Sequence, residues 1–399
     1  MTAPWLDIIG VGADGLPSLS PVAISALEQA DAIYAGERLH ALTEGVPGER
    51  VSWPTPFDAM ISSLKARRGK KTVVLATGDP LWYSIGARLG REIDPAEIIY
   101  HPQLSGFQFA AARMGWSLAD VETLTVHGRA PEQMIPFIQP GAKLLILPWD
   151  GSTPSVLGGF LAERGYGDSR ITALANLGSA DEQRFEGTAN APPSYVPGFH
   201  VLAVECMAGD DTLVLGRGGG LPDHVFQGDG TMTKQEVRAI TLAKLMPMRG
   251  QHLWDIGSGC GSVAVEWMRA ARDATATGVE PRDDRCAYAR ANATALGTPK
   301  LKLVQGTAPD ALNGLVQPDA VFIGGGLSGT VFETAWAALP KHGRLVANGV
   351  TLETEAVLRD LHARHGGQLV RIAVERAEPV GDRTGWRPAM TVTQWSLMK

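Results

Sequence analysis

Residues 253–261 read LWDIGSGCG, an apolar run that leads into Asp255 and then into three glycines at alternate positions, Gly257, Gly259 and Gly261. The helix-like stretch VAVEWMRAAR follows one residue later. A strand, a glycine-rich turn and a helix in this order form the nucleotide-binding corner of an α/β sheet, because the turn is tight and a ligand must approach its backbone closely. The sequence therefore predicts a nucleotide-type pocket at the end of this strand.

The next acidic residue, Glu280, indicates the kind of ligand. It ends the short run TATGVE, where a carboxylate can accept hydrogen bonds from both hydroxyls of a ribose. The glycines follow D-x-G-x-G-x-G and not the G-x-G-x-x-G of dinucleotide sites. S-adenosylmethionine (SAM) carries no pyrophosphate, so its loop need not present a helix N-terminus to phosphate oxygens. We therefore favour SAM over NAD, the alternative being a turn that only joins a strand to a helix.

Length and composition limit the classes of protein. A chain of 399 residues predicts two or three domains, of which two is the simplest count. The net charge of −6, with no basic run longer than Lys65–Lys71, argues against nucleic-acid binding. No apolar run approaches the roughly 18 residues of a membrane span, and the three cysteines stand far apart. We expect a cytoplasmic protein without a metal site, a disulfide or a membrane segment.

Apolar strands and helical stretches alternate in both halves of the chain, which predicts α/β layers. One of the predicted helices covers residues 57–68. A Gly- and Asp-rich stretch at 207–232 separates the halves, so we expect a first domain at 1–209, a linker at 210–230 and a second domain at 231–399. The second half predicts a mostly parallel, doubly wound sheet, closed by an antiparallel pair of strands at 368–378 and 389–397.

The first half begins with a glycine loop, Gly10–Gly15, that formally matches the dinucleotide pattern. In a dinucleotide site the third glycine opens a helix. Here five residues intervene before a helix that starts with Ser20 as N-cap and Pro21 in its first position. We therefore do not assign NAD to this loop. A second turn, Gly78-Asp79-Pro80, follows the strand TVVLAT directly and lies at the carboxyl edge of the sheet, where α/β ligands bind.

Together with the segment HPQLSGFQFA at 101–110, these two turns resemble the tetrapyrrole methyltransferases, SAM enzymes built from two α/β lobes. The resemblance covers residues 5–205, and the subtype it most resembles methylates carbon 5 of a precorrin. It implies that SAM is held by these residues: Gly78, Asp79, Trp82, Ser105, Gly106 and Leu177, with Asn176 beside the last. The sequence departs from the family pattern at Ala13-Asp14, where a proline is usual, and at Gln103, where a glycine is usual.

The second half resembles the decarboxylating precorrin methyltransferases over residues 216–399. The motifs that carry the resemblance occur in order: GLPD at 220–223, MTKQEVR at 232–238, DIGSGCG at 255–261, QGTAP at 305–309, IGG at 323–325 and GWRPAMTVTQW at 385–395. The resemblance implies a donor pocket lined by Thr233, Gly257, Ser258, Gly259, Cys260, Gly261, Glu280, Thr307 and Ala308. It places Ile323 and Gly324 toward the tetrapyrrole.

Two of these residues also have a local explanation. Thr233 and Glu236 are spaced as a capping box at the start of a helix. Cys260 is expected to fill space in the turn, because no base neighbours it in sequence to make it a nucleophile.

Both families on one chain imply a fold of two parts, a two-lobed tetrapyrrole methyltransferase followed by a Rossmann-like SAM-dependent domain. They imply a bifunctional methyltransferase of cobalamin (vitamin B12) biosynthesis with two SAM sites. It would methylate carbons 5 and 15 of precorrin-6B and remove carbon dioxide from the ring C acetate, giving precorrin-8X. The alternatives are a single-activity SAM enzyme acting on another tetrapyrrole, on RNA or on protein, and a non-catalytic tetrapyrrole-binding protein.

A tetrapyrrole carries many carboxylates, which arginines recognise in a bidentate manner. Arg217, Arg238, Arg383 and Arg387 flank the motifs of the second half and are our candidates, the alternative being solvated surface charges. His101 and His224 also lie beside motifs, and we favour a structural role for both. The sequence identifies no catalytic acid or base, and we expect the chain to form a homo-oligomer.

Overall fold

The computed structural model of the protein describes residues 4–54 and 59–399. The chain folds into two units. The first contains the residues up to Arg129 together with Ile138–Leu213, and the second contains Ala130–Phe137 together with Val214–Lys399. The short segment 130–137, mostly a 3-10 helix at Pro131–Phe137, thus belongs with the second unit although the chain on both sides of it belongs with the first.

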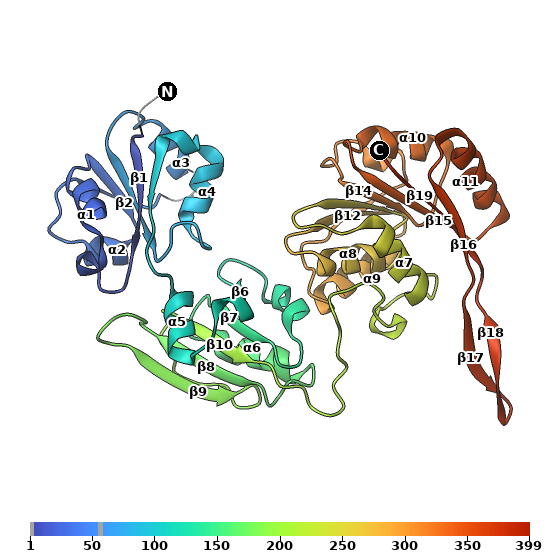
Figure 1. Ribbon diagram of the computed structural model, residues 1–399, viewed down its shortest axis with the longest axis horizontal. Coiled ribbons are helices and arrows are strands. Elements are labelled where there is room, and N and C mark those ends of the chain that lie inside the picture. Colours follow the sequence, from blue (N-terminus) through green and yellow to red (C-terminus); the bar gives the residue numbers. More distant parts are fainter. Residues whose placement is uncertain (1–3, 55–58) are drawn as a thin grey trace. The chain divides into compact units, whose positions relative to one another are not determined.

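The first lobe of unit 1 is a parallel sheet covered by helices on both faces (Figure 1). Its strands are β1 (Leu6–Val11), β2 (Ala32–Ala35), β3 (Glu49–Ser52), β4 (Thr72–Thr77) and β5 (Ile98–His101). They lie in the order β3-β2-β4-β1-β5, and every pairing is parallel. Helices α1 (Pro21–Glu28) and α2 (Glu37–Leu42) pack on one face, and α3 (Ala59–Lys65) and α4 (Ile85–Glu92) pack on the other. The predicted start of the third helix at residue 57 lies outside the described residues.

The second lobe of unit 1 is a mixed sheet. Its strands are β6 (Glu122–Thr125), β7 (Lys143–Leu147), β8 (Arg170–Ala175), β9 (Gln183–Thr188) and β10 (His200–Glu205). Their order is β6-β7-β10-β8-β9, and only the pairing of β6 with β7 is parallel. Helix α5 (Gly106–Met114) buries Phe107 and Ala110 against this sheet, and α6 (Thr153–Ala162) lies against β8.

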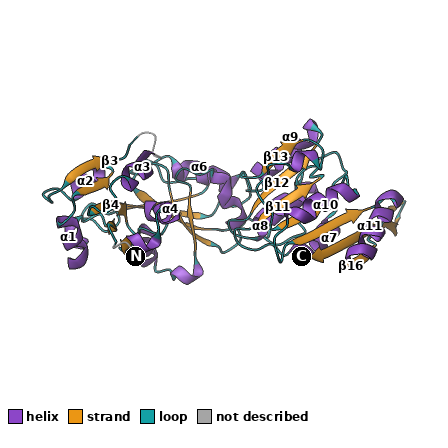
Figure 2. Ribbon diagram, turned by 90° about the horizontal axis from the view of Figure 1, so that it is seen from above, coloured by secondary structure: helices purple, strands orange, loops and turns teal. Residues whose placement is uncertain are grey.

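Unit 2 is the doubly wound sheet that the sequence predicts, with helices on both faces (Figure 2). Its strands are β11 (His252–Ile256), β12 (Thr275–Glu280), β13 (Lys302–Gln305), β14 (Ala320–Ile323), β15 (Arg344–Gly349), β16 (Gln368–Ile372) and β19 (Val392–Met398). In the order β13-β12-β11-β14-β15-β19-β16 the first five strands are parallel, and β19 runs antiparallel to both of its neighbours. The predicted mostly parallel sheet with an antiparallel edge is therefore confirmed.

The helices of unit 2 divide between two apolar cores. Helices α7 (Gln235–Leu245) and α8 (Ser262–Ala270) pack on one face of the sheet, and α9 (Asp283–Ala295) lies beside α8. Helices α10 (Gly329–Ala338) and α11 (Leu352–His365) pack on the other face around Trp395, which is fully buried. Across the described residues, no helix combines the length and the hydropathy needed to cross a bilayer.

The end of the chain contains a hairpin that the sequence did not reveal. The strand expected at 368–378 is interrupted after Ile372, and it resumes as β17 (Glu375–Val380), which pairs only with β18 (Arg383–Pro388). Gly381, at φ +63°, forms the turn between them. This hairpin arm leaves Trp386 72% exposed.

Two expected helix starts had different outcomes. Ser20 caps α1 as predicted, since its side chain accepts a hydrogen bond from the Ala23 amide. The capping box at Thr233 and Glu236 is wrong: Lys234 is the N-cap of α7, and no side chain caps the helix. The carbonyl of Thr233 instead accepts a hydrogen bond from Arg238, 2.6 Å away, so a side chain inside the helix fixes its entry.

The glycine turn after β11 is constrained by a second loop. Gly257 has φ +69°, and a Cβ atom at this position would lie 2.7 Å from the Gly325 amide nitrogen in the loop after β14. Gly259 has φ +56°, but a Cβ atom there would meet no other atom within 4 Å. Both positions require a left-handed backbone, and only Gly257 also requires the absence of a side chain.

We predict that Gly257→Ala destabilises the protein more than the matched variant Gly259→Ala. Both carry the backbone cost of about 1–2 kcal/mol, and Gly257→Ala adds a steric cost of about 1–3 kcal/mol. Thermal and urea unfolding of the full chain measure the difference. Equal losses of stability in the two variants would contradict this account of the turn.

Candidate active sites

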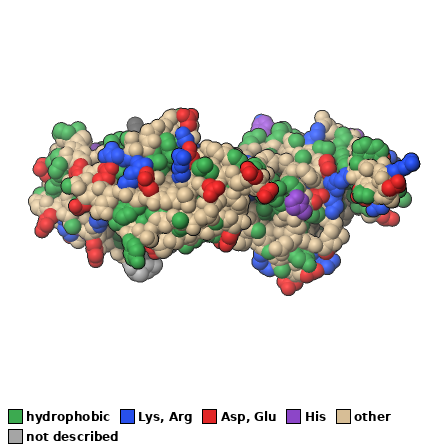
Figure 3. Space-filling view, turned by 90° about the horizontal axis from the view of Figure 1, so that it is seen from below, with side chains coloured by type: hydrophobic (Ala, Val, Ile, Leu, Met, Phe, Trp, Pro, Cys, Tyr) green, Lys and Arg blue, Asp and Glu red, His purple; other side chains and the backbone are tan. Residues whose placement is uncertain are grey.

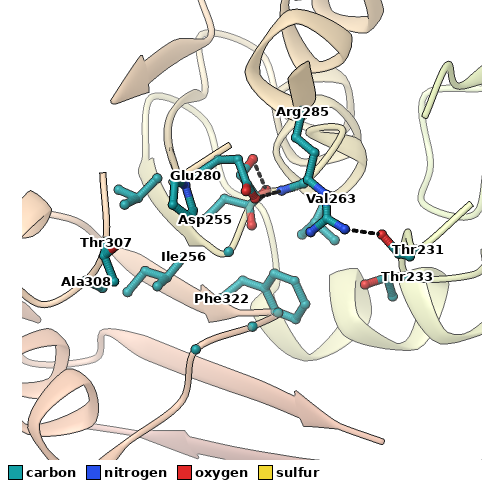
Figure 4. A pocket seen from close by; sticks show the side chains of 18 of the residues that line it. Thr231, Thr233, Asp255, Ile256, Val263, Glu280, Arg285, Thr307, Ala308 and Phe322 are labelled. Atoms are coloured by element: carbon teal, nitrogen blue, oxygen red, sulfur yellow. Dashed lines mark hydrogen bonds between the residues drawn. The ribbon is translucent and has the colours of Figure 1, made fainter. Parts of the chain in front are cut away.

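A pocket lies at the carboxyl edge of the unit 2 sheet, where β11, β12 and β14 end (Figure 4). The chain reaches this edge five times, which is why residues far apart in the sequence meet there. The lining residues are Thr231, Met232, Thr233, Asp255, Ile256, Gly257, Ser258, Gly259, Val263, Val279, Glu280, Pro281, Arg285, Gly306, Thr307, Ala308, Phe322, Gly324, Gly325 and Gly326.

Glu280 occupies the last position of β12 and is 2% exposed. One carboxylate oxygen accepts a hydrogen bond from the Gly259 amide at 2.9 Å, and the other accepts one from the Arg282 amide at 3.1 Å. Each carboxylate oxygen has a second lone pair that these amides do not use. The side chain is therefore held rigidly at the pocket wall and can still accept hydrogen bonds from a pair of hydroxyls.

Asp255 is the second buried carboxylate of the pocket. Its Oδ2 atom accepts hydrogen bonds from the Ala264 amide and the Ser258 hydroxyl, at 3.1 and 3.2 Å. Its Oδ1 atom is buried and has no hydrogen-bond partner among the described residues. Burial raises the pKa of Asp255 to about 7, against the effect of its two donors, and the nearby charge of Glu280 raises it further. A cationic group placed beside Oδ1 would compensate this carboxylate.

Arg285 connects the pocket to the segment that precedes α7. Its guanidinium donates to the Asp229 carboxylate at 2.9 Å and to the Thr231 hydroxyl at 2.8 Å, and the second bond is drawn in Figure 4. Hydrogen bonds from Thr231, and then from Arg285, hold the pKa of Asp229 well below its usual range. On the inner side, the Asn292 carboxamide pairs with both backbone groups of Gln227. The segment 227–233 is thus fastened to α9 and forms one wall of the pocket.

Arg238 fastens the same segment from inside the protein, and it does so from a fully buried position. Its guanidinium bonds to Glu266 at 2.6 Å, to Asp223 at 2.9 Å, and to the backbone carbonyls of Leu221 and Thr233. Glu266, also fully buried, accepts hydrogen bonds from the amides of Gly220 and Leu221. The GLPD motif at 220–223 and Arg238 therefore form one clamp.

The clamp corrects one sequence expectation. Arg238 was predicted to bind a substrate carboxylate, but it is shielded from solvent and its nitrogens are already bonded to protein oxygens. The sequence shows that Arg238 lies beside a motif. It does not show that Arg238 pairs with Glu266, a buried acidic residue 28 positions further along the chain.

The structure brings most of the predicted donor residues of unit 2 to the pocket. Those that line it are Thr233, Gly257, Ser258, Gly259, Glu280, Thr307 and Ala308, together with Gly324. Cys260 and Gly261 do not line it. The Cys260 side chain belongs to an apolar core with Phe226 and Val265, and Gly261 is the N-cap of α8 and lies against Ala289. The space-filling role expected for Cys260 is therefore confirmed.

The expectation for Ile323 was wrong by one residue. Ile323 is fully buried in the core beneath α10, whereas its neighbours Phe322 and Gly324 line the pocket. Successive residues of a strand point to opposite faces, so a shift of one position exchanges core for pocket. The sequence also missed Thr231 and Arg285, whose only signal was their proximity in sequence to Thr233 and Glu280.

The other three predicted arginines lie away from the pocket wall. Arg217 lies over the Phe137 ring at 4.6 Å and donates to the Arg269 carbonyl. Arg383 and Arg387 are exposed on the hairpin arm, where Arg387 pairs with Glu378 at 3.1 Å. On the face of the molecule in Figure 3, basic and acidic side chains are interspersed. A substrate role for these three residues stays a prediction.

In unit 1 the three turns identified in the sequence converge at the carboxyl edge of the first sheet. A Cβ atom on Gly10 would lie 2.3 Å from the Gly78 carbonyl and 2.8 Å from the Cβ of Gln103. A Cβ atom on Gly78, at φ +63°, would lie 2.9 Å from the Cα of Ser105. Gln103, which stands where the family has glycine, donates through its carboxamide to the Ser18 carbonyl at 2.6 Å. This departure from the pattern adds a bond between two of the turns.

The remaining predicted residues of unit 1 surround this junction. Trp82 packs on Phe107 with ring centroids 5.3 Å apart, and Leu177 belongs to the same apolar cluster. Ser105 caps α5, and Gly106 is its first residue. Asp79 accepts a hydrogen bond from the Leu81 amide at 2.7 Å, which closes the Gly-Asp-Pro turn. His101 forms a 2.7 Å hydrogen bond with Asp7, in agreement with the structural role expected for it.

The residues of the unit 2 pocket fit a SAM molecule in their chemistry. Glu280 offers carboxylate lone pairs for a ribose, and the buried Oδ1 of Asp255 calls for a cation such as the donor's ammonium or sulfonium group. The turn at Gly259 is open, so a ligand can lie against its backbone. No phosphate-binding arrangement is needed for such a ligand.

Comparison with known protein families agrees with this division of the chain. Residues 6–192 match the family of tetrapyrrole (corrin/porphyrin) methylases. Residues 224–399 match the family described as the precorrin methyltransferase domain.

Relatives extend over the whole chain. A precorrin-6Y C(5,15)-methyltransferase (decarboxylating) from Sinorhizobium sp is 44% identical over 402 aligned residues, covering 100% of this chain and 97% of that protein. A protein of the same name from Mycobacterium tuberculosis is 38% identical and covers 98% of this chain and 99% of its own. The crystal structure of the C-terminal domain of precorrin-6Y C5,15-methyltransferase from Rhodobacter capsulatus is 47% identical, covers 46% of this chain and 100% of that chain, and has a TM-score of 0.44.

We predict that SAM binding to unit 2 strengthens as the pH rises from 5.5 to 7. With its pKa raised to about 7, Asp255 is mostly protonated at the lower pH, and a cationic ligand favours the carboxylate. The affinity should rise roughly tenfold over this range, with release of a proton on binding. Isothermal titration in two buffers of different ionisation enthalpy measures both quantities, and Asp255→Asn should abolish the proton release. A pH-independent affinity in the wild-type protein would refute the prediction.

We also predict that Arg238→Met destabilises the protein by about 3–5 kcal/mol, because it leaves the Glu266 carboxylate buried without its cation. The matched control is Arg249→Met, whose ion pair with Asp273 is on the surface and should contribute less than about 1 kcal/mol. Urea unfolding followed by tryptophan fluorescence compares the two. If Arg238→Met were no more destabilising than Arg249→Met, the clamp would not stabilise the fold.

Proposed function

The chain belongs to the precorrin-6Y C(5,15)-methyltransferases (decarboxylating), SAM-dependent enzymes of cobalamin biosynthesis, and on this basis we propose that each of its two units holds one SAM molecule and performs one methyl transfer. Unit 1 methylates carbon 5 of the precorrin. Unit 2 methylates carbon 15 and removes the acetate carboxyl group of ring C as carbon dioxide. The substrate is precorrin-6B and the product precorrin-8X.

In unit 2 the ribose binds the Glu280 carboxylate and the methionine end of the donor passes over Gly257–Gly259. The observation that carries this assignment is the pair of buried carboxylates at the ends of adjacent strands. Glu280 is held by the Gly259 amide, and one oxygen of Asp255 has no hydrogen-bond partner among the described residues. Thr231 and Thr233 supply hydroxyls on the opposite wall. Thr307 and Ala308 line the pocket beyond β13.

In unit 1 the donor lies where the three turns meet. Gly78, Ser105 and the loop at Gly10 approach so closely that side chains larger than hydrogen are excluded at the two glycines. Backbone groups, together with Trp82, Leu177 and the amide end of α5 at Gly106, then provide the binding surface. Such a surface suits an uncharged adenosyl group and needs no metal ion.

SAM supplies an electrophilic methyl group on a sulfonium centre. The protein aligns an electron-rich bridging carbon of the precorrin with that centre, and such alignment can lower a barrier by about 7–11 kcal/mol. No protein base is required for the attack. In the loss of carbon dioxide the macrocycle accepts the electron pair of the breaking bond, and the enzyme orients the leaving carboxylate.

Self-association and location belong to the same proposal. The hairpin arm exposes Trp386 and Val380, 72% and 64% exposed, which is the kind of apolar surface that another copy of the chain can cover. Arg383 and Arg387 on this arm, and Arg217, stay candidates for contacts with substrate carboxylates. We expect the enzyme to act in the cytoplasm.

We predict that titration with SAM gives two sites per chain and that Glu280→Gln removes one of them. Glutamine has one acceptor oxygen in place of two, so it can keep only one of the hydrogen bonds that Glu280 accepts from the Gly259 and Arg282 amides, and it loses the negative charge. With precorrin-6B and isotopically labelled SAM, this variant should lose the methyl group at carbon 15 and the release of carbon dioxide. Methylation at carbon 5 should continue and serves as the internal control, read by mass spectrometry and NMR.

Other outcomes would decide between the alternatives. One site in the wild-type protein would leave a single-activity methyltransferase. Loss of both methyl groups in Glu280→Gln would refute the assignment of separate donor sites to the two units. No methyl transfer by the wild-type chain would overturn the proposed reaction.

A further inference from the structure

Arg38 of unit 1 is an arginine that forms no ion pair with any carboxylate in the part of the chain that the structure describes. It lies in the first turn of α2, the helix that follows β2 at the carboxyl edge of the first sheet. Its guanidinium donates one hydrogen bond, to the Thr77 hydroxyl at 2.9 Å, and covers the Phe199 ring at 4.2 Å. Among the described residues, no Asp or Glu lies within ion-pair distance of it. The packing of Thr77 and Phe199 against Arg38 partly desolvates its guanidinium, and this lowers the pKa of Arg38.

Most other arginines of this unit differ in this respect. Six of them form ion pairs within the unit: Arg67 with Glu49, Arg68 with Glu97, Arg113 with Glu182, Arg164 with Glu163, Arg170 with Glu205 and Arg184 with Glu186. Arg50 is bonded to the carbonyls of Thr43 and Val46 inside the fold of its own lobe. Among the described residues Arg38 has neither an ion pair nor a hydrogen bond to a backbone carbonyl. Most of its five N–H donors are therefore available to a ligand.

The position of Arg38 connects it to both halves of the donor site proposed for unit 1. Thr77, its hydrogen-bond partner, immediately precedes the Gly78-Asp79 turn. The backbone carbonyl of Phe199, whose ring Arg38 covers, accepts a hydrogen bond from the backbone N–H of Asn176, next to Leu177. Arg38 and Thr77 are both solvent-accessible, so a ligand can reach the guanidinium from outside. A planar guanidinium fixed on one face by an aromatic ring presents its edge in a defined direction.

We propose that Arg38 binds a peripheral carboxylate of the tetrapyrrole at the carbon 5 site and thereby positions the macrocycle against the donor. Its guanidinium can donate hydrogen bonds to both oxygens of one carboxylate, and a ligand carboxylate would provide the negative charge that balances it. This inference rests on the proposed function, because it requires that unit 1 methylates a tetrapyrrole. It concerns substrate binding only, since the Arg38 contacts do not include a group that could transfer a proton to the ring.

The test is steady-state methylation of precorrin-6B by the full chain, with methyl groups at carbons 5 and 15 counted separately. Arg38→Met should raise the KM of the carbon 5 reaction about 10- to 100-fold, because it removes charge-assisted hydrogen bonds to the substrate. Its kcat should change less than its KM. Arg38→Lys keeps the charge without the fork and should lie between Met and the wild-type protein.

Three controls separate a binding role from a structural one. The carbon 15 reaction of the same variants should be unchanged, and so should the SAM affinity measured by titration. Arg91→Met, at an exposed arginine in the last turn of α4, should leave the carbon 5 reaction unchanged. Phe199→Leu removes the ring but keeps Arg38, and it should raise the same KM by a smaller factor.

The outcomes distinguish this inference from the one on which it rests. A wild-type KM for carbon 5 in Arg38→Met would overturn the role of Arg38 while leaving the proposed function intact. A loss of thermal stability or of SAM affinity that accounts for the whole effect would show that Arg38 only joins the two lobes. No methylation at carbon 5 by the wild-type chain would overturn the proposed function itself, and the role of Arg38 with it.

Discussion

The unit 2 site depends on two carboxylates that are buried at the ends of adjacent parallel strands. Glu280 ends β12 and receives the Gly259 amide, while Asp255 lies in β11 and receives the Ala264 amide. Both amides belong to the segment that follows β11. The glycine turn in this segment therefore lies beside two carboxylates. A buried carboxylate that is incompletely bonded is costly. In the proposed function a cationic ligand would compensate it, and the pocket would then favour a positively charged donor.

The wall opposite these carboxylates is held by a different kind of interaction. The segment before α7 has little regular structure, and the clamp of Arg238 and Glu266 gives it a fixed position. Buried ion pairs contribute less to net stability than their distances imply, because both ions must lose their water. They are sensitive to geometry, however, and a clamp that bonds to four separate backbone groups specifies one path for the loop. The outer contact of Arg285 with Asp229 and Thr231 is partly exposed, and therefore weaker.

The sites proposed for the two units lie at the same topological position but are built differently. In both, the site lies at the carboxyl edge of a parallel sheet, where strand ends and helix starts expose backbone groups. Unit 2 places three charged side chains, Asp255, Glu280 and Arg285, in the wall of its pocket. Unit 1 brings three turns together so closely that glycine is required at Gly10 and Gly78. Near the site proposed for unit 1, Arg38 is a positive charge that has no carboxylate partner among the described residues.

The sequence by itself determined the class of each unit, the glycine turns, and Glu280 as an acidic residue of the unit 2 pocket. These features are local: a strand, a turn and a helix within about thirty residues carry their own signal. Only the tertiary structure decided that Arg238 is buried with Glu266, that Phe322 and not Ile323 faces the pocket, and that Arg285 reaches a segment 54 residues away. Hydrogen bonds, burial and ion pairs depend on which distant segments of the chain meet in the fold. A single sequence does not show these contacts. A single sequence therefore specifies the residues that form a turn, and the packed fold specifies which side chains remain free to bind a ligand.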